Sequence, residues 1–280
     1  MTINNKIGFM QGRLSPQFNN IIQSFPWDHW RQEFNIAKEI GLSKMEWTID
    51  DYDYYKNPIF LSKERKEIKR LAKTNSVEIT SLTGDCLMQN PFWKSKGQKK
   101  KDLEEKFIDL IFACENLGIS IIVIPLVDNG RIEKNQNVSS LLDFFDRKRD
   151  IIESNNILFA FESDFDPESL KKFINLFDKT KIGINYDIGN SASMGFNPKE
   201  EIDAYSDSIF NVHVKDRVKG GTTVALGQGD ADFLTVFREL NTKNYKGNYI
   251  LQTARCKKGN HSELLKSFKE MTAKWIENGS

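Results

Sequence analysis

The amino-acid sequence predicts an α/β protein, a single (β/α)8 barrel domain over residues 1–280 with its active site at the C-terminal ends of the strands. Eight short apolar runs alternate from end to end with segments whose apolar residues have helical spacing. The length of 280 residues suits one such barrel, and no linker interrupts the alternation. A doubly wound open sheet is the alternative. However, the segment QGRLSPQFNN after the first strand is not a glycine-rich dinucleotide fingerprint.

The eight predicted strands are short and mostly apolar, and helix signals lie between them. We expect strands over residues 7–11, 44–49, 78–84, 120–127, 158–163, 182–188, 210–216 and 248–253. Gly41 and Gly118 are predicted to end helices, because glycine readily takes the left-handed conformation of a helix C-cap. Asp166-Pro167 and Asn197-Pro198 are predicted to begin helices as an N-cap followed by proline. One continuous helix is expected over residues 140–155.

Composition and charge narrow the class of protein. The formal net charge of +1 leaves no excess of positive charge for a long run of phosphates, so nucleic acid is not expected as the main partner. The longest clean apolar run, residues 121–127, is too short to cross a membrane, and the N-terminus lacks a signal-peptide pattern. Cys86, Cys114 and Cys256 form no metal-binding or disulfide pattern. We therefore expect a soluble, cytoplasmic protein.

Four polar residues lie at the ends of four predicted strands in the second half of the chain. They are Glu162 in LFAFESD, Asp187 in IGINYDIGN, His213 in FNVHVKD and Gln252 in NYILQTAR. The C-terminal ends of barrel strands form the floor of the active site, and these strands are neighbours in a closed barrel. Two carboxylates, an imidazole and an amide oxygen suit one divalent ion, Mn²⁺, Mg²⁺, Co²⁺ or Zn²⁺. The sequence thus predicts a metal site.

With these residues in place, the whole chain resembles the xylose isomerase-like TIM barrels, in particular the sugar phosphate isomerases and epimerases. The resemblance rests on IGFMQGRLSP, FES, YDIGN, HVKDR, LGQGDADF and the position of ILQTAR. It implies one divalent metal held by Glu162, Asp187, His213 and Gln252. Gln252 departs from the family pattern, which has a second glutamate here, and Asn190 stands where relatives often have a histidine.

The resemblance implies isomerisation or epimerisation of a sugar through an enediolate, with Glu162 as the base. Gln252 cannot remove a proton, so inversion of a stereocentre needs another acid. The candidates by strand position are Lys215, Asp85, Glu46 and Asp216, and Lys215 is preferred. Two alternatives stay open: a dehydratase of a keto-polyol, and a barrel that binds a sugar without turnover. Apurinic-site endonucleases fit less well, because the chain has only three histidines.

Three arginines follow predicted strands whose ends are neighbours in a closed barrel. They are Arg13, Arg217 and Arg255. Arginine presents a planar fork that suits phosphate or carboxylate, so an anionic sugar is the expected substrate. Glu46, Asp85, Asn190 and Asp216 complete the predicted substrate-binding set. Neither nucleic acid nor a membrane is expected as a partner, and association into a homo-oligomer stays open.

Overall fold

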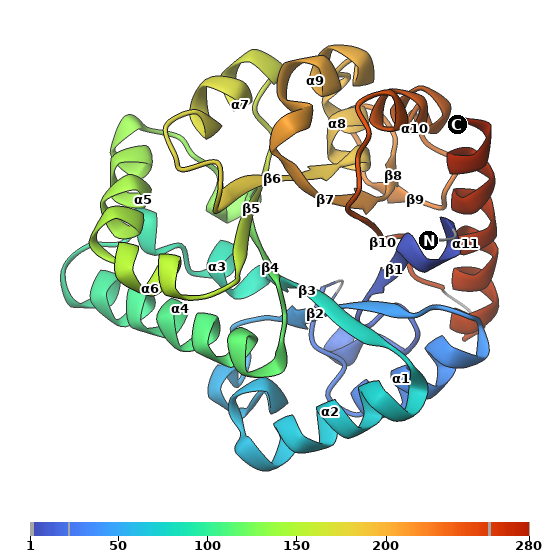
Figure 1. Ribbon diagram of the computed structural model, residues 1–280, viewed down its shortest axis with the longest axis horizontal. Helices are drawn as coiled ribbons and strands as arrows, with labels where there is room; N and C mark the ends of the chain where they lie inside the picture. The colour runs from blue at the N-terminus through green and yellow to red at the C-terminus, as the bar shows by residue number, and fades with distance from the viewer. Residues whose placement is uncertain (1–2, 22, 257–258, 280) are drawn as a thin grey trace.

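The structure is a computed structural model that describes residues 3–21, 23–256 and 259–279, and at its centre lies a closed barrel of parallel strands (Figure 1). The barrel strands are β1 (Ile7–Met10), β2 (Lys44–Ile49), β3 (Glu78–Gly84), β4 (Ile121–Leu126), β5 (Leu158–Ser163), β6 (Ile182–Asp187), β7 (Ile209–Val214) and β10 (Asn248–Leu251). Their order around the barrel follows the chain, and β1 closes it by pairing with both β10 and β2. The predicted (β/α)8 barrel is confirmed.

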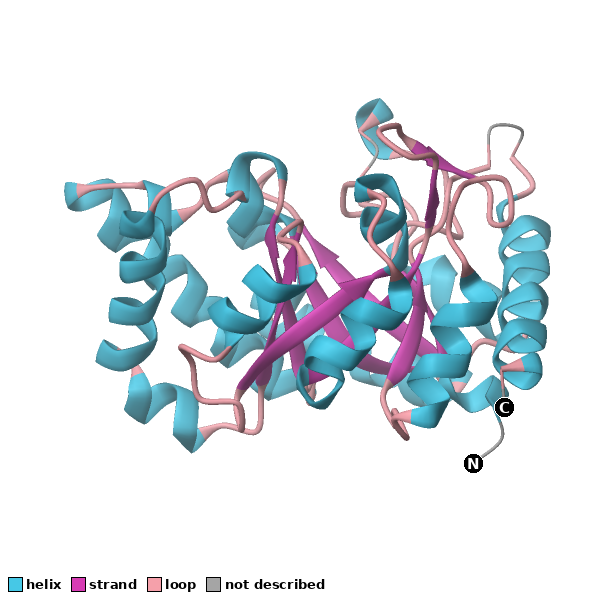
Figure 2. Cartoon of the chain, turned by 90° about the horizontal axis from the view of Figure 1, so that it is seen from above, coloured by secondary structure: helices cyan, strands magenta, loops and turns pink. Residues whose placement is uncertain are grey.

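Helices surround the strands on all sides (Figure 2). They are α1 (Trp30–Glu39), α2 (Ser62–Asn75), α3 (Asp85–Gln89), α4 (Gly97–Leu117), α5 (Asn135–Arg147), α6 (Arg149–Ser154), α7 (Pro167–Ile174), α8 (Ile188–Met194), α9 (Pro198–Tyr205), α10 (Phe233–Thr242) and α11 (His261–Asn278). Two short strands, β8 (Asp216–Arg217) and β9 (Thr223–Val224), form a hairpin after β7. This hairpin and the C-terminal end of α11 lie at opposite ends of the barrel (Figure 2).

The predicted helix signals match the structure, with one exception. Gly118 caps α4 with a φ of 77°, and the side chain of Asp166 accepts a hydrogen bond from the Ser169 amide at the start of α7. The expected helix over residues 140–155 is divided into α5 and α6 at Lys148. The break falls within the charged stretch RKRD, where no apolar side chain is available to anchor the helix to the barrel.

The interior of the barrel changes from apolar to polar along its axis. Leu158 and Ala160, on the same face of β5 as Glu162, pack with Ile121 and Val123 in a small apolar cluster. Closer to the C-terminal ends of the strands, the interior holds buried polar side chains: Glu46, Ser81, Asn185, Asn211 and His213. Burial of so many polar groups is costly unless they bond to one another.

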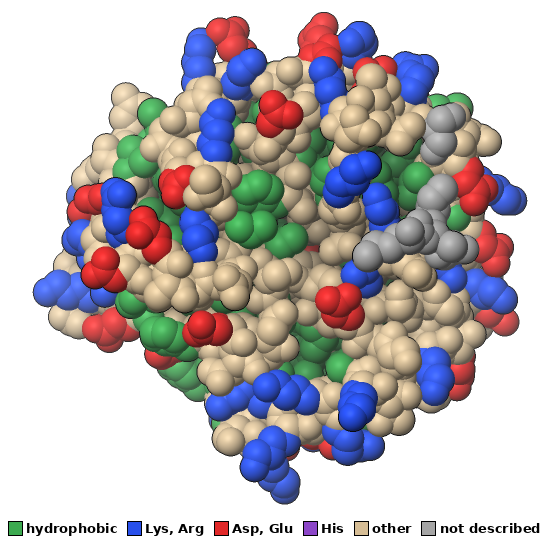
Figure 3. Space-filling view, viewed as in Figure 1, with side chains coloured by type: hydrophobic (Ala, Val, Ile, Leu, Met, Phe, Trp, Pro, Cys, Tyr) green, Lys and Arg blue, Asp and Glu red, His purple; other side chains and the backbone are tan. Residues whose placement is uncertain are grey.

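The outer surface carries both signs of charge. On the face seen in Figure 3, lysine and arginine side chains alternate with aspartate and glutamate around the rim, and neither sign forms a continuous patch. Within the described part of the chain, no helix is both long and apolar enough to cross a membrane.

Candidate active site

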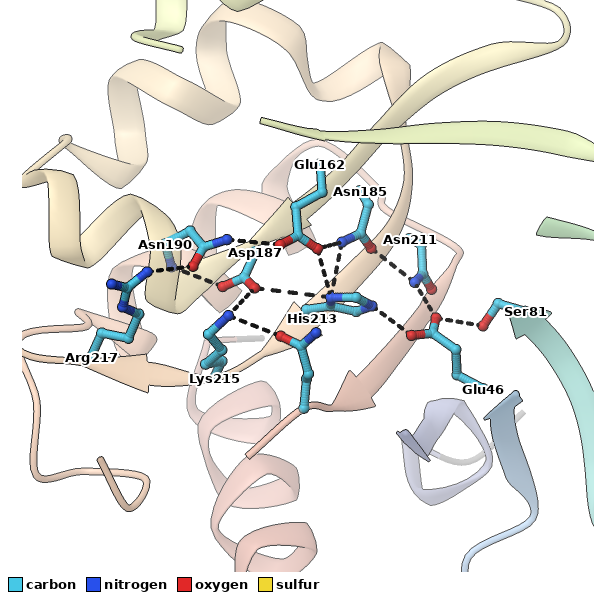
Figure 4. A network of polar contacts seen from close by, with 11 residues as sticks. Glu46, Ser81, Glu162, Asn185, Asp187, Asn190, Asn211, His213, Lys215 and Arg217 are labelled. Carbon is cyan, nitrogen blue, oxygen red and sulfur yellow. Dashed lines mark hydrogen bonds and ion pairs between the residues drawn. The ribbon is translucent and has the colours of Figure 1, made fainter. Parts of the chain in front are cut away.

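Glu162, Asp187 and His213 come together at the C-terminal ends of β5, β6 and β7 (Figure 4). Each of them offers one ligand atom, and these atoms all lie within 4.8 Å of one another. The Nδ1 atom of His213 is 3.1 Å from Oε2 of Glu162 and 4.0 Å from Oδ2 of Asp187. All three side chains are buried, so two carboxylates and an imidazole share a space that water barely reaches.

Glu46 on β2 fixes the orientation of the His213 ring. Its Oε1 atom is 2.8 Å from Nε2 of His213, while its Oε2 atom accepts hydrogen bonds from Ser81 and Asn211 at 2.8 and 3.0 Å. Burial alone would lower the pKa of His213, but the neighbouring carboxylates of Glu46 and Glu162 raise it to about 10. A carboxylate behind a histidine in this way is typical of metal-binding histidines, and it turns Nδ1 toward Glu162.

Two asparagines hold the carboxylate of Glu162. Asn185 donates to Oε2 and Asn190 donates to Oε1, both at 2.8 Å. Burial alone would raise the pKa of Glu162, but its contact with His213 and the nearby charge of Lys215 outweigh burial and lower that pKa. Glu162 is therefore ionised at neutral pH, as a general base must be.

Sequence reasoning assigned no role to Ser81, Asn185 and Asn211, although each binds a residue of the cluster. A signal for two of them was present in the strands. Asn211 lies two residues before His213, and Asn185 two residues before Asp187, so each shares the inward face of its strand. Alternation along a strand does not predict which side chain on another strand each of these residues will bind.

Lys215 connects Asp187 to Gln252. Its ammonium group donates to Oδ2 of Asp187 at 2.8 Å and to Oε1 of Gln252 at 3.0 Å. The stem of the lysine packs against Gly189, where an added Cβ would lie 2.7 Å from Cγ of Lys215. The glycine of the YDIGN motif thus makes room for this side chain. Burial raises the pKa of Asp187, although the charge of Lys215 opposes that rise.

These residues fit one divalent ion. The ligand atoms of Glu162, Asp187 and His213 converge, and the set of two carboxylates with an imidazole suits a hard or borderline metal. Gln252 lies beside this group, with its amide oxygen already accepting a hydrogen bond from Lys215. Glu162, Asp187 and His213 therefore form the core of the site, and Gln252 offers a neutral amide oxygen at its edge.

The loop after β1 places Arg13 at the mouth of the barrel. The buried carboxylate of Glu33 accepts hydrogen bonds from the amides of Gly12 and Leu14 and from the hydroxyl of Ser15, at 2.9–3.0 Å. Arg13 donates from Nε to the carbonyl oxygen of Thr253 at 2.9 Å. No carboxylate of the described residues lies within ion-pair distance of its buried guanidinium, and burial together with Arg255 lowers its pKa to about 9.

The other two arginines bind nearby loops. Arg255 donates to the carbonyl oxygens of Gly12 and Ser15, so it lies beside the Arg13 loop. Arg217 donates to Oδ1 of Asn190 at 2.9 Å and to the carbonyl oxygen of Gly221. The structure thus groups Arg13 with Arg255, whereas Arg217 supports the asparagine that holds Glu162.

Asp216 is not brought into the cluster. Its two carboxyl oxygens accept hydrogen bonds from the amides of Gly227, Gly229 and Ala231 at 2.8–3.2 Å, and an added Cβ on Gly229 would lie 2.2 Å from Oδ1 of Asp216. Asp216 therefore holds the LGQGDADF loop. Strand alternation explains its position, since Asn211, His213 and Lys215 occupy the inward face.

A family model described as the xylose isomerase-like TIM barrel matches residues 34–272. The chain belongs to this family. The xylose isomerase-like barrel is 25% identical over 240 residues to a Haemophilus influenzae protein named "Putative L-ribulose-5-phosphate 3-epimerase SgbU", covering 80% of this chain and 83% of that protein. The predicted resemblance is confirmed.

Two solved structures share the fold of this xylose isomerase-like barrel. One is the IolI protein with a bound zinc atom, at 18% identity and a TM-score of 0.76, covering 98% of this chain and 99% of that one. The other is a sugar phosphate isomerase/epimerase from Parabacteroides distasonis, at 17% identity and a TM-score of 0.69, covering 99% and 95%. At such identities the likeness concerns the fold.

Proposed function

We propose that this protein is a divalent-metal-dependent isomerase or epimerase of a small anionic sugar, with Glu162 as the base. The observation that carries the proposal is the buried group of Glu162, Asp187 and His213, whose ligand atoms converge at the barrel mouth. The family match and the epimerase name of the relative support the same class of reaction. A zinc atom in a protein of the same fold supports a metal here.

Some residues of the site would act on a carbon-bound proton of the substrate, and others would bind its oxygens. A divalent ion held by Glu162, Asp187 and His213 would polarise a substrate carbonyl, which makes the adjacent C–H bond acidic. The ionised Glu162 carboxylate is held by Asn185 and Asn190, so it can take the proton from that carbon and leave an enediolate. Lys215 and Gln252 form the β7–β10 side of the site, where the lysine can donate a hydrogen bond to a substrate oxygen.

Gln252 favours chemistry with a single carboxylate base. A shift of a carbonyl between neighbouring carbons can use one base on one face of the substrate, whereas inversion of a stereocentre needs an acid on the other face. Loss of water from a keto-polyol through the same enediolate needs only one base and one acid, which gives a proton to the departing hydroxyl. The dehydratase and the binding-only barrel are therefore the two outcomes that an experiment must separate from isomerisation.

The test is hydrogen exchange in D₂O, followed by proton NMR. L-Ribulose 5-phosphate, suggested by the name of the relative, and its neutral counterpart L-ribulose are the first probes. We expect the sugar phosphate to exchange one carbon-bound hydrogen and to yield an isomeric sugar. A product that has lost water would identify a dehydratase. Saturable binding without any exchange would contradict the enzymatic proposal.

Arg13 is expected to bind the anionic end of the substrate, because its buried charge has no carboxylate partner within the described part of the chain. A charge-assisted hydrogen bond is worth about 1.5–3 kcal/mol, and each 1.4 kcal/mol is roughly a factor of ten. Arg13→Ala should therefore raise KM for the sugar phosphate about ten-fold or more and leave KM for the neutral sugar unchanged. Arg31→Ala, at an exposed arginine on α1, is the matched control. Equal changes in KM for both sugars would contradict this role.

Gln252→Glu should restore a carboxylate at the edge of the metal site. An ionised oxygen binds a divalent ion more strongly than an amide oxygen, so metal affinity should increase, and inversion of a stereocentre should become detectable. Metal titration and product NMR measure the two effects. Gln136→Glu makes the same change of charge at an exposed position of α5 and should alter neither. An unchanged metal affinity in Gln252→Glu would show that residue 252 lies outside the metal's reach.

A further inference from the structure

Most side chains that could act as a second proton-transfer group are engaged by the protein itself. Glu46 is bound to His213, Ser81 and Asn211. Asp216 accepts three backbone hydrogen bonds from its loop, and Lys215 is bonded to Asp187 and Gln252. Glu46 and Asp216 would have to break existing bonds before either could serve a substrate. Lys215 has one N–H left to donate a hydrogen bond, but giving up its proton would end its ion pair with Asp187.

Asp85 is the exception. It follows the last residue of β3, and its side chain is 2% exposed. Its Oδ2 atom is fully buried and has no hydrogen-bond partner among the described residues. Asp85 begins α3, and its carboxyl lies close enough to Arg13, Glu46 and Glu162 for their charges to shift its pKa, so it lies near the polar cluster. An unpartnered buried carboxyl at the mouth is poised for a ligand.

The charges around Asp85 favour its protonated form. Burial and the charges of Glu162, Asp50 and Glu46 together raise its pKa to about 8, against the opposing charge of Arg13. Its own helix α3 packs against β2, which carries Glu46, against β4, which has no titratable residue, and against the 3-10 helix Asp128–Gly130. Asp128 of that last element is exposed to solvent. At neutral pH the carboxyl is therefore mostly a neutral acid that can donate.

We propose that Asp85 is the general acid of this site and donates its proton to the substrate's carbonyl oxygen while Glu162 removes the proton from the adjacent carbon. The electrons of the broken C–H bond form the new C=C bond, and the former carbonyl oxygen takes the proton of Asp85. On the way to product, the Asp85 carboxylate takes a proton from the neighbouring hydroxyl and Glu162 returns its proton to carbon. No outside reagent is needed. This inference rests on the proposed function and deepens it.

The test compares Asp85→Asn with Asp128→Asn. Asparagine keeps the shape of Asp85 and can donate a hydrogen bond, but it has no proton to transfer. General acid catalysis contributes about 100- to 10,000-fold, so Asp85→Asn should lower kcat at least 100-fold and change KM less than about three-fold. Asp128 is exposed on the 3-10 helix that packs against α3, and asparagine tolerates its positive φ of 49°, so Asp128→Asn should keep kcat near that of the wild type.

A second measurement reports on Asp85 without catalysis. In protein labelled with ¹³C at aspartate carboxyl carbons, the resonance missing from Asp85→Asn should titrate near pH 8. Titration near the ordinary value for aspartate would overturn the proposal. An unchanged kcat in Asp85→Asn, or a change in KM alone, would also overturn the proposal. This holds if the wild type exchanges hydrogen and Glu162→Gln does not. Absence of exchange in the wild type would instead contradict the proposed function.

Discussion

Glu162→Gln is expected to abolish hydrogen exchange between sugar and D₂O and to lower kcat by about 1,000-fold or more. The amide keeps the size of the side chain but cannot accept a proton from carbon, and general base catalysis accounts for about 100- to 10,000-fold. The measurement is the rate of C–H loss by proton NMR at saturating sugar. The amide keeps one oxygen to accept from Asn185 or Asn190 and loses the other of these two hydrogen bonds, so urea denaturation of the variant checks that it is folded.

The control for this variant is Glu168→Gln, at an exposed glutamate on α7 that pairs with Lys172. It makes the same chemical change outside the barrel mouth and should exchange hydrogen at the wild-type rate. Retention of more than about a tenth of wild-type exchange in Glu162→Gln would contradict the assignment of Glu162 as the base, given the contribution expected of such a group.

Asp187→Ala is expected to remove metal, activity and part of the protein's stability together. The substitution deletes a ligand, and it leaves the buried ammonium of Lys215 without its only carboxylate partner among the described residues. Breaking a buried ion pair by removing one partner costs about 3–5 kcal/mol. Metal analysis of purified protein and urea denaturation measure the two losses.

Asp187→Asn separates charge from shape at the same position. It keeps one oxygen, which can accept a hydrogen bond either from Lys215, now bonded to Oδ2, or from the amide of Asn190, which donates to Oδ1 at 2.8 Å. We therefore expect Asp187→Asn to unfold at a urea concentration closer to wild type while still binding metal more weakly. A full complement of metal in Asp187→Ala would show that the ion, if any, is held elsewhere.

The sequence was sufficient to predict the barrel because its signals are local. Apolar runs, helical spacing and caps such as Gly118 and Asp166 depend on neighbouring residues, and the structure contains them where they were expected. The division of residues 140–155 at Lys148 was missed, because helical spacing on either side of a short charged stretch reads as one helix. The hairpin of β8 and β9 was missed because two-residue strands leave no periodic signal.

The candidate site could be predicted only in part, for a physical reason. Strand ends in a barrel are neighbours, so the convergence of Glu162, Asp187 and His213 follows from their places in the strands. The hydrogen-bond partner of each of these groups cannot be predicted from its place in a strand. Glu46 reaches His213 across 167 residues of sequence, and Lys215 reaches Gln252 by the direction of one flexible side chain. Such pairings depend on register and rotamer, which a linear pattern does not contain.

The most direct test of metal-dependent proton removal is the metal dependence of hydrogen exchange in the wild-type protein. Protein stripped with a chelator and protein reloaded with Mn²⁺ or Zn²⁺ would be incubated with L-ribulose 5-phosphate in D₂O, with the metal content of each sample determined in parallel. We expect exchange to disappear in the stripped protein and to return when about one ion per chain is restored, as a single site of this kind requires. Exchange at the full rate in protein that contains no metal would contradict the account.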